Sequence, residues 1–224
     1  MKENIRLAVD GPAGAGKSTI AKLVAEKLGY TYIDTGAMYR ALTFDALNAG
    51  ISMDDEDSLT ELAAGFKINF LRMENGTRVI SGQQDVTEEI RTPLVSQNVS
   101  FVARVPGVRK HLTQLQRNLA ATGGTVMEGR DIGTVVLPDA EIKIFLTASI
   151  KERARRRCLE LRERGFEVRM SDLQKEIEER DRIDSSRSVA PLRAAQDAFV
   201  VDCSDMSIGN VVDTVMEIVS GGRN

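Results

Sequence analysis

The segment Gly11-Pro12-Ala13-Gly14-Ala15-Gly16-Lys17-Ser18 fits the phosphate-loop pattern G-x-x-x-x-G-K-[ST]. Its glycines let backbone N–H groups surround a phosphate, its lysine reaches the β- and γ-phosphates, and its serine hydroxyl binds Mg²⁺. The apolar run 5–9 before it predicts a strand, and the apolar face of 18–28 predicts a helix. The alternative, a glycine-rich turn with an exposed lysine, does not account for this strand–loop–helix context. We therefore expect residues 11–19, Thr19 included, to bind a nucleoside triphosphate, with Lys17 catalytic and Ser18 a magnesium ligand.

Short apolar runs alternate with helical patterns along the whole chain. The runs cover residues 7–9, 30–33, 125–127, 142–146 and 198–201. This alternation predicts an α/β fold, in which a parallel five-stranded sheet is flanked by helices. Ligands bind such sheets at the carboxyl ends of the strands. Polar residues follow four of the five runs directly, at Asp10, Asp34, Glu128 and Asp202.

One stretch departs from the alternation. Phe66, Ile68 and Phe70 alternate with polar residues, an Asn75-Gly76 pair follows, and Val79 begins a second apolar run. An Asn-Gly pair between alternating runs is typical of a β-hairpin. We predict an inserted subdomain over 65–91, which could extend into 92–105.

Composition narrows the class of protein. The 224 residues carry a net charge of −3, which argues against a broad basic surface for nucleic acid. The two cysteines, Cys158 and Cys203, form no CxxC or Cys/His cluster, so we expect reduced thiols and no zinc site. His111 is the single histidine, and we interpret it as an ordinary helix residue. The N-terminus has no signal-peptide pattern and no apolar run approaches 18 residues, so we expect a cytoplasmic protein without a membrane partner.

Two motifs follow predicted strands at the expected binding edge. The first, 34–40, reads DTGAMYR and brings Thr35 and Arg40 to that edge. The second, 128–133, reads EGRDIG, in which Arg130 can bind a phosphate and Asp131 can accept hydrogen bonds. The alternatives are a capped ordinary helix for the first motif and a surface Arg130–Asp131 pair for the second. The combination of residue types favours an acceptor-substrate site instead.

An arginine-rich segment lies late in the chain. Residues 151–193 include 13 basic and 10 acidic residues. Arginines three and four positions apart share a helix face, so two helices joined around Gly165 could close over bound phosphates as a lid. We expect Arg153 and Arg157 of this lid to be catalytic. The alternative is a solvated charged helix stabilised by pairs along its own face.

These motifs together resemble those of the bacterial cytidylate kinases, a branch of the nucleoside monophosphate kinases. The resemblance runs from Ile5 to Val219 and rests on GPAGAGKS, DTGAMYR, the insert ending in DVTEEIR, EGRDIGTVV, ERARRR, and ERDRIDSSR followed by APL. It implies a core of 1–64, 92–150 and 190–224, an NMP-binding insert at 65–91, and a helical lid at 151–189. The chain does not depart from the family at the motif positions, although some relatives carry serine in place of Thr35.

The resemblance also implies the chemistry and the residues that perform it. The donor is ATP with Mg²⁺, the acceptor is CMP or dCMP, and the setting is pyrimidine nucleotide metabolism, in a monomer whose partners are small-molecule nucleotides. Arg40, Arg130 and Arg187 would hold the acceptor phosphate. Thr35, Arg109 and Asp131 would read cytosine, while Ser100, Arg180 and Asp184 would face the sugar. Cytosine offers an N4 amino donor beside two acceptors, which suits a carboxylate combined with hydroxyl and guanidinium donors.

Two other functions stay open at this point. One is a small-molecule P-loop kinase with a different acceptor, which nucleotide competition would distinguish. The other is a nucleotide-dependent RNA-binding module, in which the arginine-rich segment binds the RNA. The low aromatic content of 4%, with no tryptophan, argues against the second.

Overall fold

The structure is a computed structural model that describes residues 4–73 and 76–221. The chain divides into two compact units. One comprises the residues up to Asp34 together with those from Leu119 onward, and the other runs from Thr35 to Asn118. Each unit has its own hydrophobic core, and each is described by itself below.

The first unit is built on a five-stranded parallel sheet in the order β2-β6-β1-β7-β8. Its strands are β1 (Arg6–Asp10), β2 (Thr31–Asp34), β6 (Thr125–Gly129), β7 (Ile142–Thr147) and β8 (Phe199–Asp202). All five predicted strands are therefore confirmed, as is their parallel arrangement. Strand β1 is central, because β6 and β7 pair with it on either side.

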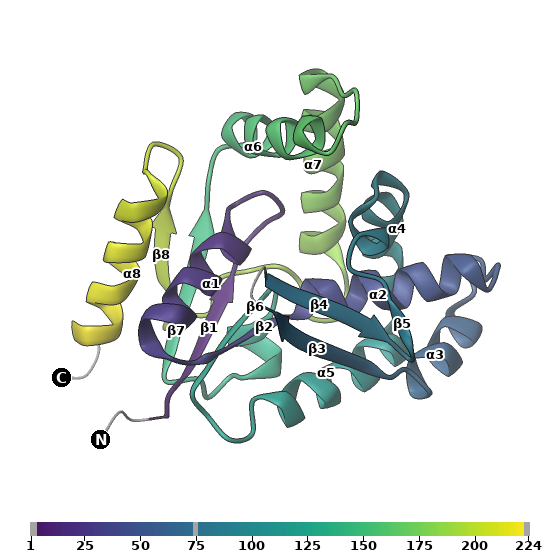
Figure 1. The fold of residues 1–224 in the computed structure, drawn as a ribbon, viewed down its shortest axis with the longest axis horizontal. Coiled ribbons are helices and arrows are strands. Elements are labelled where there is room, and N and C mark those ends of the chain that lie inside the picture. Colours follow the sequence, from purple (N-terminus) through teal and green to yellow (C-terminus); the bar gives the residue numbers. More distant parts are fainter. Residues whose placement is uncertain (1–3, 74–75, 222–224) are drawn as a thin grey trace. The chain divides into compact units, whose positions relative to one another are not determined.

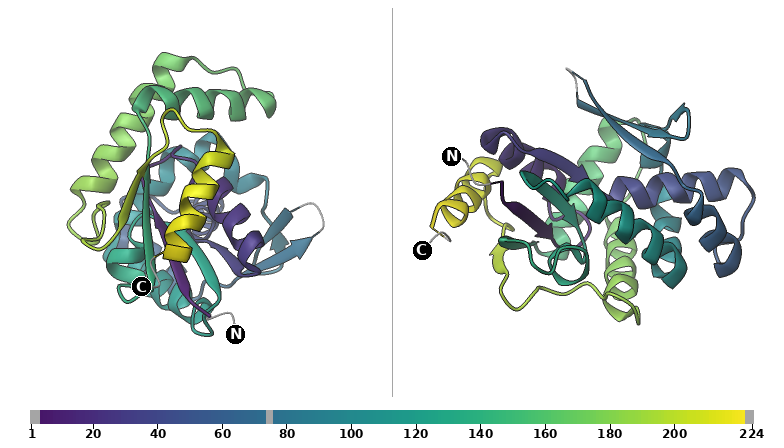
Figure 2. Two further views of the ribbon diagram at one scale, coloured as in Figure 1. Left: turned by 90° about the vertical axis from the view of Figure 1, so that its left-hand side faces the viewer. Right: turned by 90° about the horizontal axis from the view of Figure 1, so that it is seen from below.

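Side chains alternate between the two faces of this sheet. Leu7 and Val9 pack with α1 (Lys17–Leu28) and α8 (Ile208–Gly221), which lie side by side (Figures 1 and 2). Ala8 packs on the opposite face, against residues of the π-helical turn η2 (Ile132–Val136). The period-2 pattern of a strand thus buries both faces of the central strand and fixes its register.

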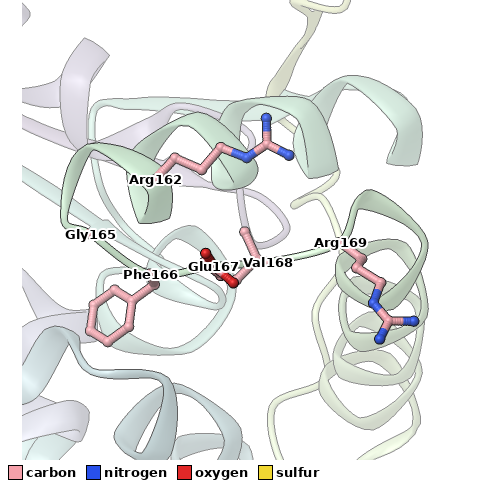
Figure 3. A pocket seen from close by; sticks show the side chains of 6 residues that line it. All are labelled: Arg162, Gly165, Phe166, Glu167, Val168 and Arg169. Carbon is pink, nitrogen blue, oxygen red and sulfur yellow. The ribbon is translucent and has the colours of Figure 1, made fainter.

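The predicted lid forms two helices, α6 (Ile150–Glu163) and α7 (Met170–Ser186), in the same unit. Gly165 lies between them with a φ of 84°, which confirms the predicted break. Ala154, Cys158 and Leu161 pack against Leu173 and Ile177 to form a small core between the helices. The connecting loop borders an open pocket, in which Arg162 and Arg169 extend from opposite ends of the loop (Figure 3).

The second unit contains helices and, on one side of them, a small antiparallel sheet (Figures 1 and 2). Its elements are α2 (Thr35–Asn48), α3 (Glu56–Ala64), β3 (Ile68–Met73), β4 (Gly76–Ser81), β5 (Gln84–Asp85), the 3₁₀ turn η1 (Glu89–Arg91), α4 (Pro93–Arg104) and α5 (Pro106–Leu119). Strands β3 and β4 confirm the predicted hairpin. Asn75 of its predicted turn lies outside the described residues. His111 lies within α5, as expected.

The unit from Thr35 to Asn118 contains the whole predicted insert of 65–91 and is wider than it. Residues 35–64, which the family resemblance places in the core, share a hydrophobic cluster with the insert through Leu42, Leu59 and Val79. The functional boundaries of core, insert and lid stay predictions. Among the described residues, no helix has the length and apolar character that crossing a bilayer requires.

Candidate active site

The phosphate loop begins where β1 ends, in the centre of the sheet. Gly11 has a φ of 148°, and a Cβ there would lie 1.9 Å from the carbonyl oxygen of Leu146. Gly16 precedes helix α1 in the left-handed conformation, with a φ of 91°. Both positions therefore require glycine. The local sequence produces the tight strand-to-helix turn that the phosphate-loop pattern predicts.

Lys17 lies buried at the start of α1 and is 6% exposed. Its Nζ donates to the carbonyl oxygen of Pro12 at 2.8 Å. Burial lowers the pKa of Lys17 to about 7, and the positive charge of Arg130 acts in the same direction, while Glu128 opposes it. A buried ammonium near arginines is electrostatically unfavourable until an anion arrives, as expected of a phosphate-binding lysine.

This burial predicts how stability depends on pH. The pKa of Lys17 is about 7 in the fold against 10.5 ordinarily, so the unfolded chain binds more protons between these values. Folding must release this proton in that range, so the protein becomes less stable as pH falls from 10.5 to about 7. We expect the unfolding free energy of the wild type, relative to Lys17→Met, to rise by up to about 1.4 kcal/mol per pH unit above pH 7. Urea unfolding of both proteins at pH 7, 8 and 9 measures this difference. A difference that stays constant with pH would contradict the assigned burial of the ammonium.

Acidic groups lie at the carboxyl ends of the strands next to the loop. The hydroxyl of Tyr32 on β2 donates to the Glu128 carboxylate on β6, and the Ser18 hydroxyl is a further hydrogen-bond partner of Glu128. Burial raises the pKa of Glu128, and the negative charge of Asp34 raises it further. Hydroxyl and carboxylate oxygens thus gather at the first turn of α1, and such hard oxygen ligands suit Mg²⁺. The donor set therefore fits the expected metal.

A cationic cluster surrounds Asp184, near the end of α7. Arg130 Nε donates to Asp184 Oδ2 at 3.1 Å, and Arg187 Nη1 lies 4.0 Å from Asp184 Oδ1. Burial alone would raise the pKa of Asp184, but the charges of Arg130, Arg180 and Arg187 outweigh it and hold that pKa below its usual range. Three guanidinium groups near one carboxylate leave a net positive charge. The cluster also influences Lys17, since Arg130 and Arg180 both lower the pKa of that lysine.

Asp131 joins this cluster from the loop after β6. Its residue is 4% exposed, and Arg187 Nη2 lies 3.5 Å from its Oδ1. The alternative of a solvent-exposed Arg130–Asp131 pair does not describe this arrangement, because Asp131 is buried and Arg130 pairs with Asp184. The structure thus brings together five of the predicted acceptor residues in one unit. They are Arg130, Asp131, Arg180, Asp184 and Arg187.

Arg153 was expected to be catalytic, and its guanidinium is occupied by protein groups. Nε donates to the carbonyl oxygen of Ala148 at 2.9 Å, and Nη1 to that of Ala13 at 3.1 Å. Nη2 donates to Asp181 Oδ2 on α7 at 2.6 Å. Arg153 therefore connects the phosphate loop to both lid helices. Its role in phosphoryl transfer stays a prediction.

The other arginines at the start of the lid have different surroundings. Arg156 donates to the carbonyl oxygens of Ala15 and Cys203, so it also holds the phosphate loop. Arg157, the second expected catalytic arginine, pairs with Glu160 at 2.9 Å. Arg155 is exposed and pairs with Glu152 on its own helix, as the charged-helix alternative describes. That alternative thus holds for some lid arginines and not for others.

The remaining predicted acceptor residues lie in the second unit. Thr35 is the first residue of α2 and is buried, and Arg40 follows on the same helix. Ser100 is buried on α4. Arg109 on α5 is 3% exposed, its Nη1 donates to the carbonyl oxygen of Ala103 at 3.1 Å, and its guanidinium carbon lies 5.7 Å from the centre of the Tyr39 ring. A buried arginine over an aromatic ring is held in one orientation.

The sequence pattern marks Asp10 and Glu128 as polar strand ends without indicating a role for either, and it does not distinguish Tyr32 or Asp181 from their neighbours. Their partners are 28 to 123 positions away in the chain. Their positions near strand ends, or within the arginine-rich segment, are the sequence features that indicate proximity to the site. Nothing in the spacing identifies the partner.

A phosphate loop at the end of the central strand, with a buried lysine beside a cationic cluster, defines a P-loop kinase. Residues 7–221 match the family model for cytidylate kinase. The chain is 56% identical to the cytidylate kinase of Pelotomaculum thermopropionicum, over 97% of this chain and 96% of that protein. It is 53% identical to that of Geobacillus sp. strain WCH70, over 98% of each chain. The chain belongs to the cytidylate kinase family.

Solved structures share the fold at low identity. Shikimate kinase from Acinetobacter baumannii in complex with shikimate aligns with a TM-score of 0.52 and 12% identity, covering 99% of this chain and 96% of that one. An uncharacterized protein from Eubacterium ventriosum aligns with a TM-score of 0.51 and 13% identity, covering 98% and 99%. These similarities concern the fold and not the acceptor substrate.

Proposed function

We propose that the protein transfers the γ-phosphoryl group of ATP to CMP or dCMP, giving ADP and CDP or dCDP. The observation that carries this proposal is the cationic cluster around Asp184, in the same unit as the phosphate loop and close enough to lower the pKa of Lys17. A second anionic substrate needs such a cluster. The cytidylate kinases that the chain resembles act on a nucleotide of this kind.

On the donor side, residues 11–19 would surround the phosphates of ATP, and Lys17 would compensate the charge that develops on the transferred group. Ser18 would hold Mg²⁺, with Glu128 and Asp34 nearby as further oxygen ligands or as acceptors for its water. The metal supplies additional neutralisation of the phosphate charge when bound. No nucleophile on the protein is required, because phosphoryl transfer depends on position and charge.

On the acceptor side, Arg130 and Arg187 would bind the phosphate of CMP, and the family resemblance implies the same role for Arg40. Two phosphates that approach each other repel strongly. At an effective dielectric constant of ~20, one pair of unit charges ~4 Å apart is worth ~4 kcal/mol. Several guanidinium groups are therefore needed to bring the acceptor into line. Binding of the phosphate would replace some contacts with Asp184, which would then turn to the sugar together with Arg180, and the family resemblance implies a sugar contact for Ser100 as well.

The base would be read by Asp131, and the family resemblance implies the same role for Thr35 and Arg109. The Asp131 carboxylate would accept the N4 amino hydrogen of cytosine, a contact that uracil cannot make because it carries O4 there. Arg109 is suited to this task, since Tyr39 and Ala103 hold its guanidinium in place. Base selectivity would thus come from groups that are largely buried.

The lid would close over the nucleotides and exclude water, which limits wasteful hydrolysis of ATP. Arg153 and Arg157 are the proposed catalytic lid residues. For Arg153 this requires its guanidinium to exchange a protein carbonyl for a phosphate oxygen on closure. We further propose a cytoplasmic monomer that serves pyrimidine nucleotide metabolism and binds neither nucleic acid nor membranes.

The test is ADP formation by the purified protein with ATP and each nucleoside monophosphate in turn. We expect turnover with CMP and dCMP to exceed that with UMP, AMP, GMP and dTMP by at least about tenfold in kcat/KM. Preference for another small acceptor, such as a sugar or a different nucleotide, would favour the alternative P-loop kinase. Salt-sensitive RNA binding without CMP-dependent ADP formation would favour the nucleic-acid module.

A further inference from the structure

Asp10, the last residue of β1, makes two short hydrogen bonds to the loop that follows β6. Its Oδ1 accepts from the backbone N–H of Ile132 at 2.8 Å, and its Oδ2 accepts from that of Gly133 at 2.7 Å. The residue is 4% exposed. A carboxylate that accepts two backbone N–H groups in a buried place is a strong and directional contact. Asp10 therefore fixes the start of the turn η2.

Asp131 occupies the position just before this turn, where an aspartate ordinarily caps the following N–H groups with its own carboxylate. The Asp131 side chain makes no such capping hydrogen bond. Its Oδ1 instead lies 3.5 Å from Arg187 Nη2. Asp10 thus performs the capping from a neighbouring strand, and Asp131 points toward the cationic cluster.

The position of Asp10 is fixed by strand pairing on both sides of β1. Asp10 is paired in register with Gly129 of β6 on one side and with Phe145 of β7 on the other. Gly129 lies only two residues before Asp131, so the cap is attached close to the point where the loop leaves the sheet. The position of the loop is therefore set by the centre of the fold.

Charge repulsion between Asp10 and Asp131 also favours this orientation of the Asp131 side chain. Burial raises the pKa of Asp10 to about 6, the negative charge of Asp131 raises it too, and the two backbone hydrogen bonds and Lys17 oppose these effects. The two carboxylates therefore repel each other. This repulsion favours an Asp131 carboxylate directed away from Asp10 and toward the arginines.

We propose that Asp10 is a positioning residue for base recognition: it caps the turn after Asp131 and thereby holds the Asp131 carboxylate toward the nucleotide. This inference rests on the proposed function, in which Asp131 accepts the N4 amino hydrogen of cytosine. It assigns to Asp10 an effect on the choice between CMP and UMP.

Asp10→Asn tests the inference, because the amide retains one acceptor but presents a donor to the second N–H group. We expect the ratio of kcat/KM for CMP to that for UMP to fall about 5- to 30-fold, while the KM for ATP changes less than about threefold. Glu141→Gln is the matched control. Glu141 also accepts a backbone N–H of β1, that of Arg6 at 2.7 Å, but at the opposite end of the strand. The control should retain the wild-type ratio.

A double-mutant cycle with Asp131→Asn separates positioning from a general structural role. If Asp10 acts through Asp131, the double variant should have the same CMP to UMP ratio as Asp131→Asn alone. Equal losses with CMP and UMP in Asp10→Asn, or additive effects in the double variant, would overturn the inference.

Thermal unfolding accompanies each measurement. Should Asp10→Asn not fold, Asp10→Ser, whose hydroxyl can accept one of the two N–H groups, replaces it. If neither variant folds, Asp10 is a stability residue and the positioning role is refuted. A wild-type protein that forms no ADP with CMP refutes the proposed function itself, whereas an active wild type with an unchanged ratio in Asp10→Asn refutes this inference alone.

Discussion

Lys17→Met is expected to lower kcat for the phosphorylation of CMP by at least about 100-fold, with the fold intact. The side chain of methionine retains the apolar stem of lysine in a position that is 6% exposed, but it removes the charge that would compensate the transferred phosphate in the proposed function. Loss of one such electrostatic contact in an active site costs about 10²- to 10³-fold. Initial-rate kinetics with ATP and CMP at saturation measure the effect.

Lys27→Met is the matched control, because Lys27 lies on the same helix and pairs with Asp213 at 3.8 Å. We expect wild-type turnover from it. Thermal unfolding of the Lys17 variant should give a melting temperature at neutral pH no lower than that of the wild type, since a buried charge is removed. Turnover within about threefold of the wild type would contradict the role of residues 11–19 as the ATP-binding loop.

Arg187→Ala is expected to raise the KM for CMP by about 10- to 150-fold and to leave the KM for ATP nearly unchanged. The Arg187 side chain is 4% exposed and lies against Asp131 and Asp184, so its loss removes a charge from the proposed phosphate site and leaves two buried carboxylates with less compensation. Charge-assisted contacts of this kind contribute about 1.5 to 3 kcal/mol. Arg130→Ala should behave in the same way.

Arg182→Ala serves as the control on the same helix, because Arg182 is 68% exposed and pairs with Glu179. It should change neither constant. Isothermal titration with a non-hydrolysable ATP analogue and with CMP separates the two substrates. If ATP affinity fell in Arg187→Ala while CMP binding stayed the same, the cationic cluster would belong to the donor.

The architecture of the first unit was predictable because its signals are local. Each strand is a short apolar run, and the phosphate loop combines a strand, glycines and a helix within one continuous segment. The break at Gly165 and the hairpin around Val79 are equally local, since turn residues separate two periodic segments. Periodicity and turn chemistry therefore sufficed for these elements.

The interactions within the site were less predictable. Arg130 and Asp184 are 54 positions apart, and Asp10 is 122 positions from Ile132. Residue type shows that each can carry charge, but only the fold shows which charges meet. Arg153 illustrates the limit, because its sequence environment matches that of the other lid arginines and yet its guanidinium binds the carbonyl oxygen of Ala13.

The contact of Arg153 with Asp181 has a consequence for attempts to redesign the acceptor. Helix α6 holds the phosphate loop through Arg153, while on α7 Arg180 directly precedes Asp181 and Asp184 lies within one turn of it. Arg153 therefore links the phosphate loop directly to the helix that carries two of the proposed acceptor residues. Variants with altered acceptor specificity and unchanged ATP binding should therefore be sought at positions that leave the Arg153–Asp181 contact intact.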